Sequence, residues 1–185
     1  MLAGDAPFVK RTYYQFPGSL ASMEIRTVRP EEYAEAGRVT ALAYQEFVPP
    51  DPEPGWTDYL AMLADVDGRA SRTLVLVAVE DGRVVGTATV ELERTIGDEG
   101  ELQPGQANLR MLGVDPAARG KGVGRALVEA SLESARTAGK KVMTLRTTTL
   151  MKVAQRMYEA MGFERDPGRD EAFPEVSLLA YRKDL

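Results

Sequence analysis

The chain contains neither cysteine nor histidine among its 185 residues. Without cysteine it can form no disulfide, no thiolate metal ligand and no cysteine nucleophile. Without histidine it has no Ser-His-Asp triad, no histidine base and no imidazole metal ligand. Acid–base chemistry therefore falls to Asp, Glu, Tyr, Lys or water. A site built from carboxylates alone stays open in principle, but the acidic residues look scattered over solvated faces, and we expect no metal.

Net positive charge and long apolar runs are also missing. The formal net charge is −5, from 23 Lys and Arg against 28 Asp and Glu, whereas proteins that bind nucleic acid usually present a basic face. No apolar run approaches the ~18 residues of a membrane span. The first residues also lack the basic segment and apolar stretch of a secretory signal. We therefore expect a cytoplasmic protein with no nucleic-acid partner and no membrane association.

The length and composition predict one domain. The 44% hydrophobic and 28% charged fractions are ordinary for a globular chain of this size. Residues 1–22 contain Pro and Gly without a clear period, and we interpret them as an N-terminal extension or arm. Residues 23–185 then form the single domain, which opens with an alternating strand at Met23.

The hydrophobic periods predict the order strand, helix, helix, three strands, helix, strand, helix, two strands. Antiparallel strands come first and a single βαβ unit lies in the second half, so the fold class is a mixed α/β or α+β sheet. The strands are expected at 23–30, 73–80, 83–93, 108–114, 141–147, 163–166 and 175–183, and the helices at 30–47, 56–68, 122–138 and 150–162.

A glycine-rich segment, RGKGVG at 119–124, lies between a predicted strand and a predicted helix. It fails the dinucleotide fingerprint because Arg125 stands where the third glycine belongs, and it lacks the nucleotide-triphosphate motif. It is either a turn with glycines for geometry alone or a pyrophosphate site. The second interpretation is favoured by its position, because a helix N-terminus presents unpaired N–H groups and the positive end of the helix dipole.

These residues resemble the GCN5-related N-acetyltransferase (GNAT) family. The family's acetyl-CoA loop has the pattern [QR]-x-x-G-x-[GA], which Arg119, Gly122 and Gly124 match at each specified position. Downstream, AQRMYEAMGF at 154–163 is similar to the family's A-x-x-x-Y-x-x-x-G-F segment. The predicted element order also fits the family from Met23 to the C-terminus.

The resemblance implies acetyl-CoA as the acyl donor and a mostly antiparallel sheet whose central parallel strands, 108–114 and 141–147, splay apart. The pantetheine arm would pair with main-chain groups between these strands. Tyr158 would protonate the departing CoA thiolate, although its spacing also suits simple packing beside Ala154 and Met161. The implied cofactor-binding residues are Leu112, Gly113 and Val114 for the pantetheine, and Arg119, Gly120, Lys121, Gly122, Val123, Gly124 and Arg125 for the pyrophosphate.

The sequence departs from the family pattern in two places. Met151 stands where many members carry an Asn that contacts the cofactor, and the strand before the loop has no carboxylate for a general base. The nearest alternatives are Glu91 and Glu93, which are expected to share one face of a strand end. We interpret both as solvated charges rather than as a catalytic pair, and the general base stays unassigned.

The expected acceptor is a primary amine of a small molecule or peptide, acetylated by direct attack. Its pocket would form around the first two helices, where Phe47, Trp56 and Tyr59 either line it or pack the core. The segments 48–55 and 97–105 are the connections expected to carry specificity, and the acidic overall charge weakly favours a cationic amine. The alternative is a non-catalytic CoA-binding or sensor module. The acyl chain is not specified by the loop, and a homodimer is possible by resemblance.

Overall fold

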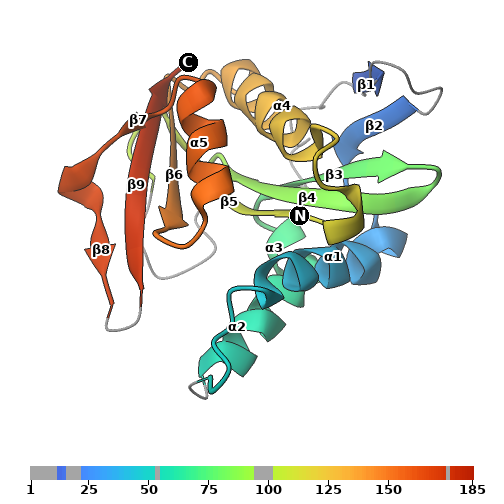
Figure 1. Ribbon diagram of the computed structural model, residues 1–185. Coiled ribbons are helices and arrows are strands. Elements are labelled where there is room, and N and C mark those ends of the chain that lie inside the picture. The colour runs from blue at the N-terminus through green and yellow to red at the C-terminus, as the bar shows by residue number, and fades with distance from the viewer. Residues whose placement is uncertain (1–11, 16–21, 53–54, 94–101, 174–175) are drawn as a thin grey trace.

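The structure, a computed structural model, describes residues 12–15, 22–52, 55–93, 102–173 and 176–185. Within these residues, nine strands form one mixed sheet in the order β1-β2-β3-β4-β5-β6-β9-β7, with β8 paired to β9 (Figure 1). The strands are β1 Thr12–Gln15, β2 Ser22–Thr27, β3 Leu74–Glu80, β4 Arg83–Glu91, β5 Gln106–Val114, β6 Val142–Thr148, β7 Glu164–Arg165, β8 Glu171–Ala172 and β9 Ser177–Asp184. The α-helices are α1 Tyr33–Gln45, α2 Gly55–Ala64, α3 Val66–Ala70, α4 Val123–Thr137 and α5 Lys152–Ala160, and the short 3-10 turns are η1 Pro30–Glu32, η2 Pro116–Ala118 and η3 Pro167–Arg169.

Local sequence signals set several of these boundaries. Asp81 and Gly82, which join β3 to β4, both have positive φ, at 50° and 75°, as a type I′ hairpin turn requires. Gly122 is the N-cap of α4 and Gly139 follows its C-cap, with φ of 85° and 72°. Glycine tolerates this left-handed backbone at no steric cost. The predicted hairpin and the predicted helix after the glycine loop are therefore confirmed.

Helices cover both faces of the sheet. On β4, a Cβ at Gly86 would contact Val123 and Leu127 of α4, whereas the next residue, Thr87, shares a 2.7 Å hydrogen bond with Thr40 of α1. Because neighbouring side chains on a strand point to opposite faces, α4 and α1 lie on opposite sides. Helix α5 lies beside α4, and α2 and α3 lie with α1 (Figure 1). The larger hydrophobic cluster packs under α4 and the smaller one under α1 and α3.

The structure corrects the sequence analysis at one helix and at two short strands, of which β8 at Glu171–Ala172 is one. The helix expected at 56–68 is two helices, because the Asp65 side chain accepts a 2.9 Å hydrogen bond from the Gly68 N–H and begins α3. Strand β1, which pairs antiparallel with β2, was not predicted. The division into an arm at 1–22 and a domain at 23–185 stays a prediction, since residues 1–11 and 16–21 lie outside the described residues.

The central parallel pair parts midway. Strands β5 and β6 pair from Gln106 opposite Val142 to Leu109 opposite Leu145. Beyond that point β5 continues along β4 and β6 continues along β9. The splayed pair that the family resemblance implied is therefore present. In the described part of the chain, no helix has the length and apolar character needed to cross a membrane.

The contact between α1 and α2 depends on a glycine. A Cβ at Gly37, which is buried in α1, would overlap the carbonyl oxygen of Ala64 at the end of α2. We expect Gly37→Ala to force the helices apart and to destabilise the fold by about 1–3 kcal/mol, as overpacking does. Thermal unfolding followed by circular dichroism measures the effect. The control is Gly55→Ala, where nothing lies within 4 Å of the added Cβ. Equal melting temperatures for the two variants would contradict this account.

Candidate active site

The glycine loop forms the entrance to α4. The chain leaves β5, makes the short turn η2, and reaches the helix through Gly120 and Gly122, whose φ values are 77° and 85°. As the N-cap, Gly122 has no side chain that could accept from the first helical N–H groups. The first turn of α4 thus presents main-chain donors and the positive end of its dipole. This arrangement suits a phosphate group bound mainly by amides.

The cations of the loop are paired with carboxylates of this chain. Arg119 donates to Glu46 at the end of α1 over 2.8 Å, and Lys121 donates to Glu80 over 3.1 Å. Arg125 donates to Glu129, one turn along α4, over 3.0 Å. These pairs are exposed and therefore weak, so the cations can still turn toward an anion. Because the three cations are engaged in these pairs, the backbone amides are the main fixed donors of the loop.

The gap between β5 and β6 leads to this loop. A bulge interrupts the pairing of β4 with β5 between Thr87 and Thr89, and Met111 there has a φ of 50°. Such a conformation is strained for a residue with a side chain. Beyond it, Gly113 and Val114 pair with β4 on one side, and on the other side the parallel pairing with β6 has already ended. The main chain of β5 from Leu112 to Val114 thus borders the gap.

Tyr158 lies in α5, on the α4 side of the sheet. Its side chain is 5% exposed, and its ring packs edge-on against Phe163 at 5.7 Å and tilted against Tyr181 at 6.3 Å. Burial raises the pKa of Tyr158. Burial also raises the pKa of Tyr44 in α1, and the neighbouring phenols of Tyr59 and Tyr158 raise it further.

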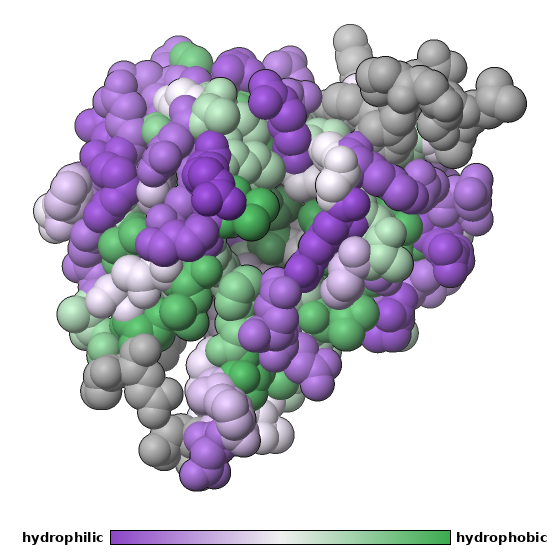
Figure 2. Space-filling model, viewed as in Figure 1, coloured by the Kyte–Doolittle hydropathy of each residue, from purple (hydrophilic) through white to green (hydrophobic). Residues whose placement is uncertain are grey.

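An aromatic pocket of about 680 Å³ lies on the α1 and α2 side. Phe47, Trp56 and Tyr59 line it, so these residues form its wall rather than the core. Met151, at the position where the family pattern often has Asn, lines it as well. The rest of the lining is Tyr44, Pro49, Asp51, Gly55, Arg110, Thr148, Leu150, Phe173, Val176 and Leu178. Figure 2 shows a central hollow with hydrophobic surface inside it. Of the two connections expected to carry specificity, residues 53–54 and 97–101 lie outside the described residues.

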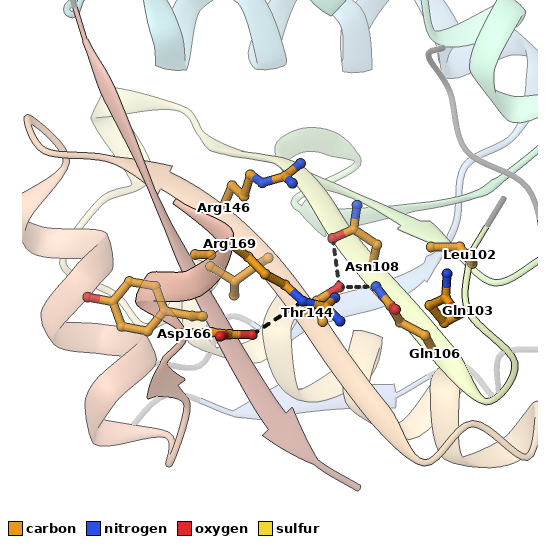
Figure 3. Close-up of a pocket in the computed structure, with 11 residues that line it drawn as sticks. Leu102, Gln103, Gln106, Asn108, Thr144, Arg146, Asp166 and Arg169 are labelled. Carbon is orange, nitrogen blue, oxygen red and sulfur yellow. Dashed lines mark hydrogen bonds and ion pairs between the residues drawn. The ribbon is translucent and has the colours of Figure 1, made fainter. Parts of the chain in front are cut away.

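Two smaller cavities extend this pocket along the sheet. A cavity of about 120 Å³ shares Arg110 with the aromatic pocket, and it shares Asn108 and Arg146 with a polar cavity of about 190 Å³. Figure 3 shows the polar cavity, where Gln106 donates to Thr144 over 2.9 Å and Thr144 donates to Asn108 over 3.2 Å. The sequence analysis did not predict these cavities. Hydrophobic periodicity indicates the face of a strand on which a side chain lies, but it does not indicate which side chains of other strands lie next to it.

The two candidate carboxylates of β4 have different surroundings. Glu93 lies beyond the end of β4, its side chain is 80% exposed, and it pairs with Lys140, so its interpretation as a solvated charge holds. Glu91 has a fully buried side chain, 3.6 Å from Arg110, and it accepts a 2.8 Å hydrogen bond from Asn108. The solvated interpretation is therefore wrong for Glu91, whose cross-strand partner on β5 is Asn108 itself.

Antiparallel strands, one splayed parallel pair and a glycine loop at the start of a helix define the GNAT class of fold. Residues 37–163, more than half of the chain, match the model of the Acetyltransferase (GNAT) family. The chain belongs to this family.

Individual relatives resemble the chain over a shorter segment or at low sequence identity. Mycothiol acetyltransferase of Sanguibacter keddieii is 37% identical over 90 residues, which cover 49% of this chain and only 28% of that relative. Among solved structures, YncA of Salmonella typhimurium, solved with its cofactor acetyl-CoA, has a TM-score of 0.61 and 24% identity over 88% of this chain and 94% of its own. The GNAT domain of S. lividans PAT has a TM-score of 0.67 and 15% identity, over 95% of this chain and 97% of its own. At these identities the structures establish the fold.

The buried tyrosines make the fold sensitive to high pH. Burial raises the pKa of Tyr158, and burial together with a hydrogen bond to Glu159 raises the pKa of Tyr181 to about 12. The unfolded chain ionises its tyrosines near pH ~10, before the folded chain does. Stability is therefore kept below that pH and lost as the pH rises above it.

We expect the free energy of unfolding, measured with denaturant from pH 8 to pH 11, to fall above pH ~10, and to fall less steeply in Tyr158→Phe. The control Tyr13→Phe removes a phenol that is 62% exposed and should leave the slope unchanged. A slope that is the same in all three proteins would contradict the assignment.

Proposed function

We propose that the chain transfers the acetyl group of acetyl-CoA to a primary amine of a small molecule or peptide by direct attack. The observation that carries this proposal is the early end of the pairing between β5 and β6. The aromatic pocket lies on the α1 side of β5, the glycine loop and Tyr158 lie on the α4 side, and the two strands part between them. An acceptor and an acyl donor can therefore meet in the gap from opposite sides.

The residues of the donor side fit coenzyme A. Main-chain groups of Leu112, Gly113 and Val114 border the gap and would pair with the pantetheine as a neighbouring strand does. The amides from Gly120 to Arg125 would hold the pyrophosphate, with the cations of the loop assisting. The likeness to YncA, which was solved with acetyl-CoA, supports the same donor here. When bound, acetyl-CoA supplies the reactive thioester.

The reaction would then need little beyond positioning and a proton donor. As the amine nitrogen bonds to the acetyl carbon and the C–S bond breaks, Tyr158 would give its hydroxyl proton to the departing thiolate. The amine nitrogen would lose one proton to solvent, and the tyrosinate would recover one from solvent. A tyrosine is already protonated at neutral pH. Burial raises the pKa of Tyr158, which keeps the phenol protonated but also makes it a weaker acid. Among the described residues that line the aromatic pocket, the carboxylate is Asp51 at its exposed rim. We therefore assign no general base and propose that the amine reacts in its neutral form.

The sequence favours a location in the cytoplasm. The proposed partner is an amine and not a nucleic acid. The net charge of −5 supports this choice of partner. A homodimer stays a prediction.

Blocking the start of α4 should abolish donor binding. We expect Gly122→Trp to show no heat of acetyl-CoA binding by calorimetry, because the indole would cover the helical amides that receive the pyrophosphate. Gly139→Trp is a matched control, since it places the same side chain on a glycine with positive φ at the other end of the same helix. The control should bind acetyl-CoA like the wild type. A wild-type chain that does not bind acetyl-CoA at millimolar concentration would end the proposal.

Removing the proton donor should slow turnover without weakening donor binding. We expect Tyr158→Phe to lower kcat by about 100-fold, the usual scale for loss of a general acid, while the Kd for acetyl-CoA stays unchanged. Release of free CoA in the presence of an amine panel measures the rate. Tyr181→Phe removes a second buried hydroxyl, which donates to Glu159, and should leave kcat close to the wild-type value. Unchanged kcat in Tyr158→Phe would show that this tyrosine serves packing alone. If the wild type binds acetyl-CoA but acetylates no amine, the chain is a CoA-binding module.

A further inference from the structure

We infer that the acceptor carries a carboxylate beside its amine and an apolar side group, and that Arg110 binds that carboxylate. The inference rests on the proposed function and names its substrate class. It starts from the placement of one cation. Arg110 lies on β5, immediately before the bulge, and borders both the aromatic pocket and the cavity of about 120 Å³ next to it.

Because Arg110 is only partly exposed to solvent, its charge attracts an anionic ligand more strongly than a fully exposed cation would. Its side chain is 24% exposed, and the rings of Tyr44 and Tyr59 line the same two cavities. Poorly solvated surroundings strengthen ionic and hydrogen-bonded contacts. The planar guanidinium can meet a carboxylate through paired N–H donors, a geometry that a lysine cannot reproduce.

Glu91, on the neighbouring strand β4, restrains the guanidinium of Arg110. The carboxylate of Glu91 is fully buried, lies 3.6 Å from Arg110, and is fixed by the 2.8 Å hydrogen bond from Asn108. A carboxylate buried this deeply does not reach an acceptor in the pocket, but it limits where the arginine can go. Glu91 is thus a positioning residue, and the arginine is the group that meets the ligand.

The charges that line the cavity of about 120 Å³ also favour an anionic acceptor. Arg110 and Arg146 line the cavity of about 120 Å³, whose lining contains no carboxylate among the residues described. Arg146 is paired with Glu171 at 2.8 Å. In the aromatic pocket the acidic residue is Asp51, which is exposed. A cationic group at the inner end of the site would face arginine, whereas a carboxylate there would be attracted.

This local charge outweighs the acidic charge of the whole chain. The net charge of −5 acts at a distance and is screened over about 8 Å at physiological ionic strength. A group inside the pocket is within contact range of Arg110 and is screened much less. The overall charge therefore affects how fast a ligand approaches, whereas Arg110 affects which ligand binds in the pocket.

The remaining lining defines the rest of the acceptor. The aromatic and aliphatic side chains around Trp56, Tyr59 and Leu178 suit an apolar group, and about 680 Å³ lies within the range of small-molecule sites. An amine, a carboxylate and an apolar side group together describe an amino acid with an apolar side chain.

The test compares acceptors that differ only in the carboxylate. Apolar amino acids, their amides and the amines that lack the carboxylate are acetylated by the wild type, Arg110→Gln and Arg110→Lys, with kcat and KM measured separately. We expect the wild type to favour the acid over its amide. In Arg110→Gln the acid-to-amide ratio of kcat/KM should fall by 10-fold or more, mainly through KM for the acid, with Arg110→Lys intermediate. Glu91→Gln should raise KM for the acid less than Arg110→Gln does.

Controls separate this inference from the proposed function. Arg182→Gln removes an arginine paired with Asp184 on β9 and should keep the wild-type ratio. Circular dichroism and acetyl-CoA calorimetry should show that the Arg110 variants fold and bind the donor. A wild-type preference for the amide or the plain amine overturns the inference, as does an equal loss for acid and amide in Arg110→Gln. So does a wild type that binds acetyl-CoA but turns over no carboxylate-bearing acceptor. Failure of acetyl-CoA binding in the wild type would instead remove the proposed function.

Discussion

The parallel pairing of β5 with β6 ends after Leu109 and Leu145, and the rest of the site depends on this break. Backbone N–H and C=O groups inside a sheet normally find partners, so an edge left open in its middle is costly unless something occupies it. The bulge at Met111, with its positive φ, turns β5 away from β6 and keeps it aligned with β4. An extended ligand that paired along β5, as proposed for the pantetheine, would give partners to the edge groups that the end of this pairing leaves open.

The aromatic pocket in turn depends on a polar network under α1. The buried guanidinium of Arg69 donates to the carbonyl groups of Leu63 and Asp65 over 2.8 Å each, and it reaches Thr40 over 3.4 Å. Thr40 is hydrogen-bonded to Thr87 on β4. A buried charge is costly unless hydrogen bonds compensate it. The bonds from the two terminal nitrogens of Arg69 therefore favour keeping the end of α2 against α1. The wall of the pocket that α2 supplies is thus fixed to the same strand that carries the bulge.

The sequence was sufficient for the features that local rules control. The hairpin at Asp81 and Gly82, the start of α4 at Gly122 and the order of the longer strands and helices follow from backbone preferences and hydrophobic periods, which are properties of short segments. The surroundings of Glu91 could not be predicted in this way. Whether a residue at a strand end is solvated depends on which side chains the neighbouring strand places beside it, and Asn108 is 17 residues away in sequence. The pairing of β4 with β5 determines the surroundings of Glu91. Tertiary packing likewise determines that Trp56 lines a pocket.

Under the proposed function, the two sides of the gap would recognise their ligands by different means. On the α4 side the fixed donors are main-chain amides, and the cations of the loop are already paired with Glu46, Glu80 and Glu129. A site built from backbone depends on glycine and helix geometry, so it tolerates changes in side chains. On the α1 side the recognition elements are side chains, with Arg110 held by Glu91 at their centre. Under the proposed function, substitutions there would change which acceptor binds and leave the donor site unaltered. One scaffold can therefore keep a constant acyl donor while its acceptor changes, provided that the bulge keeps the gap open between the two sites.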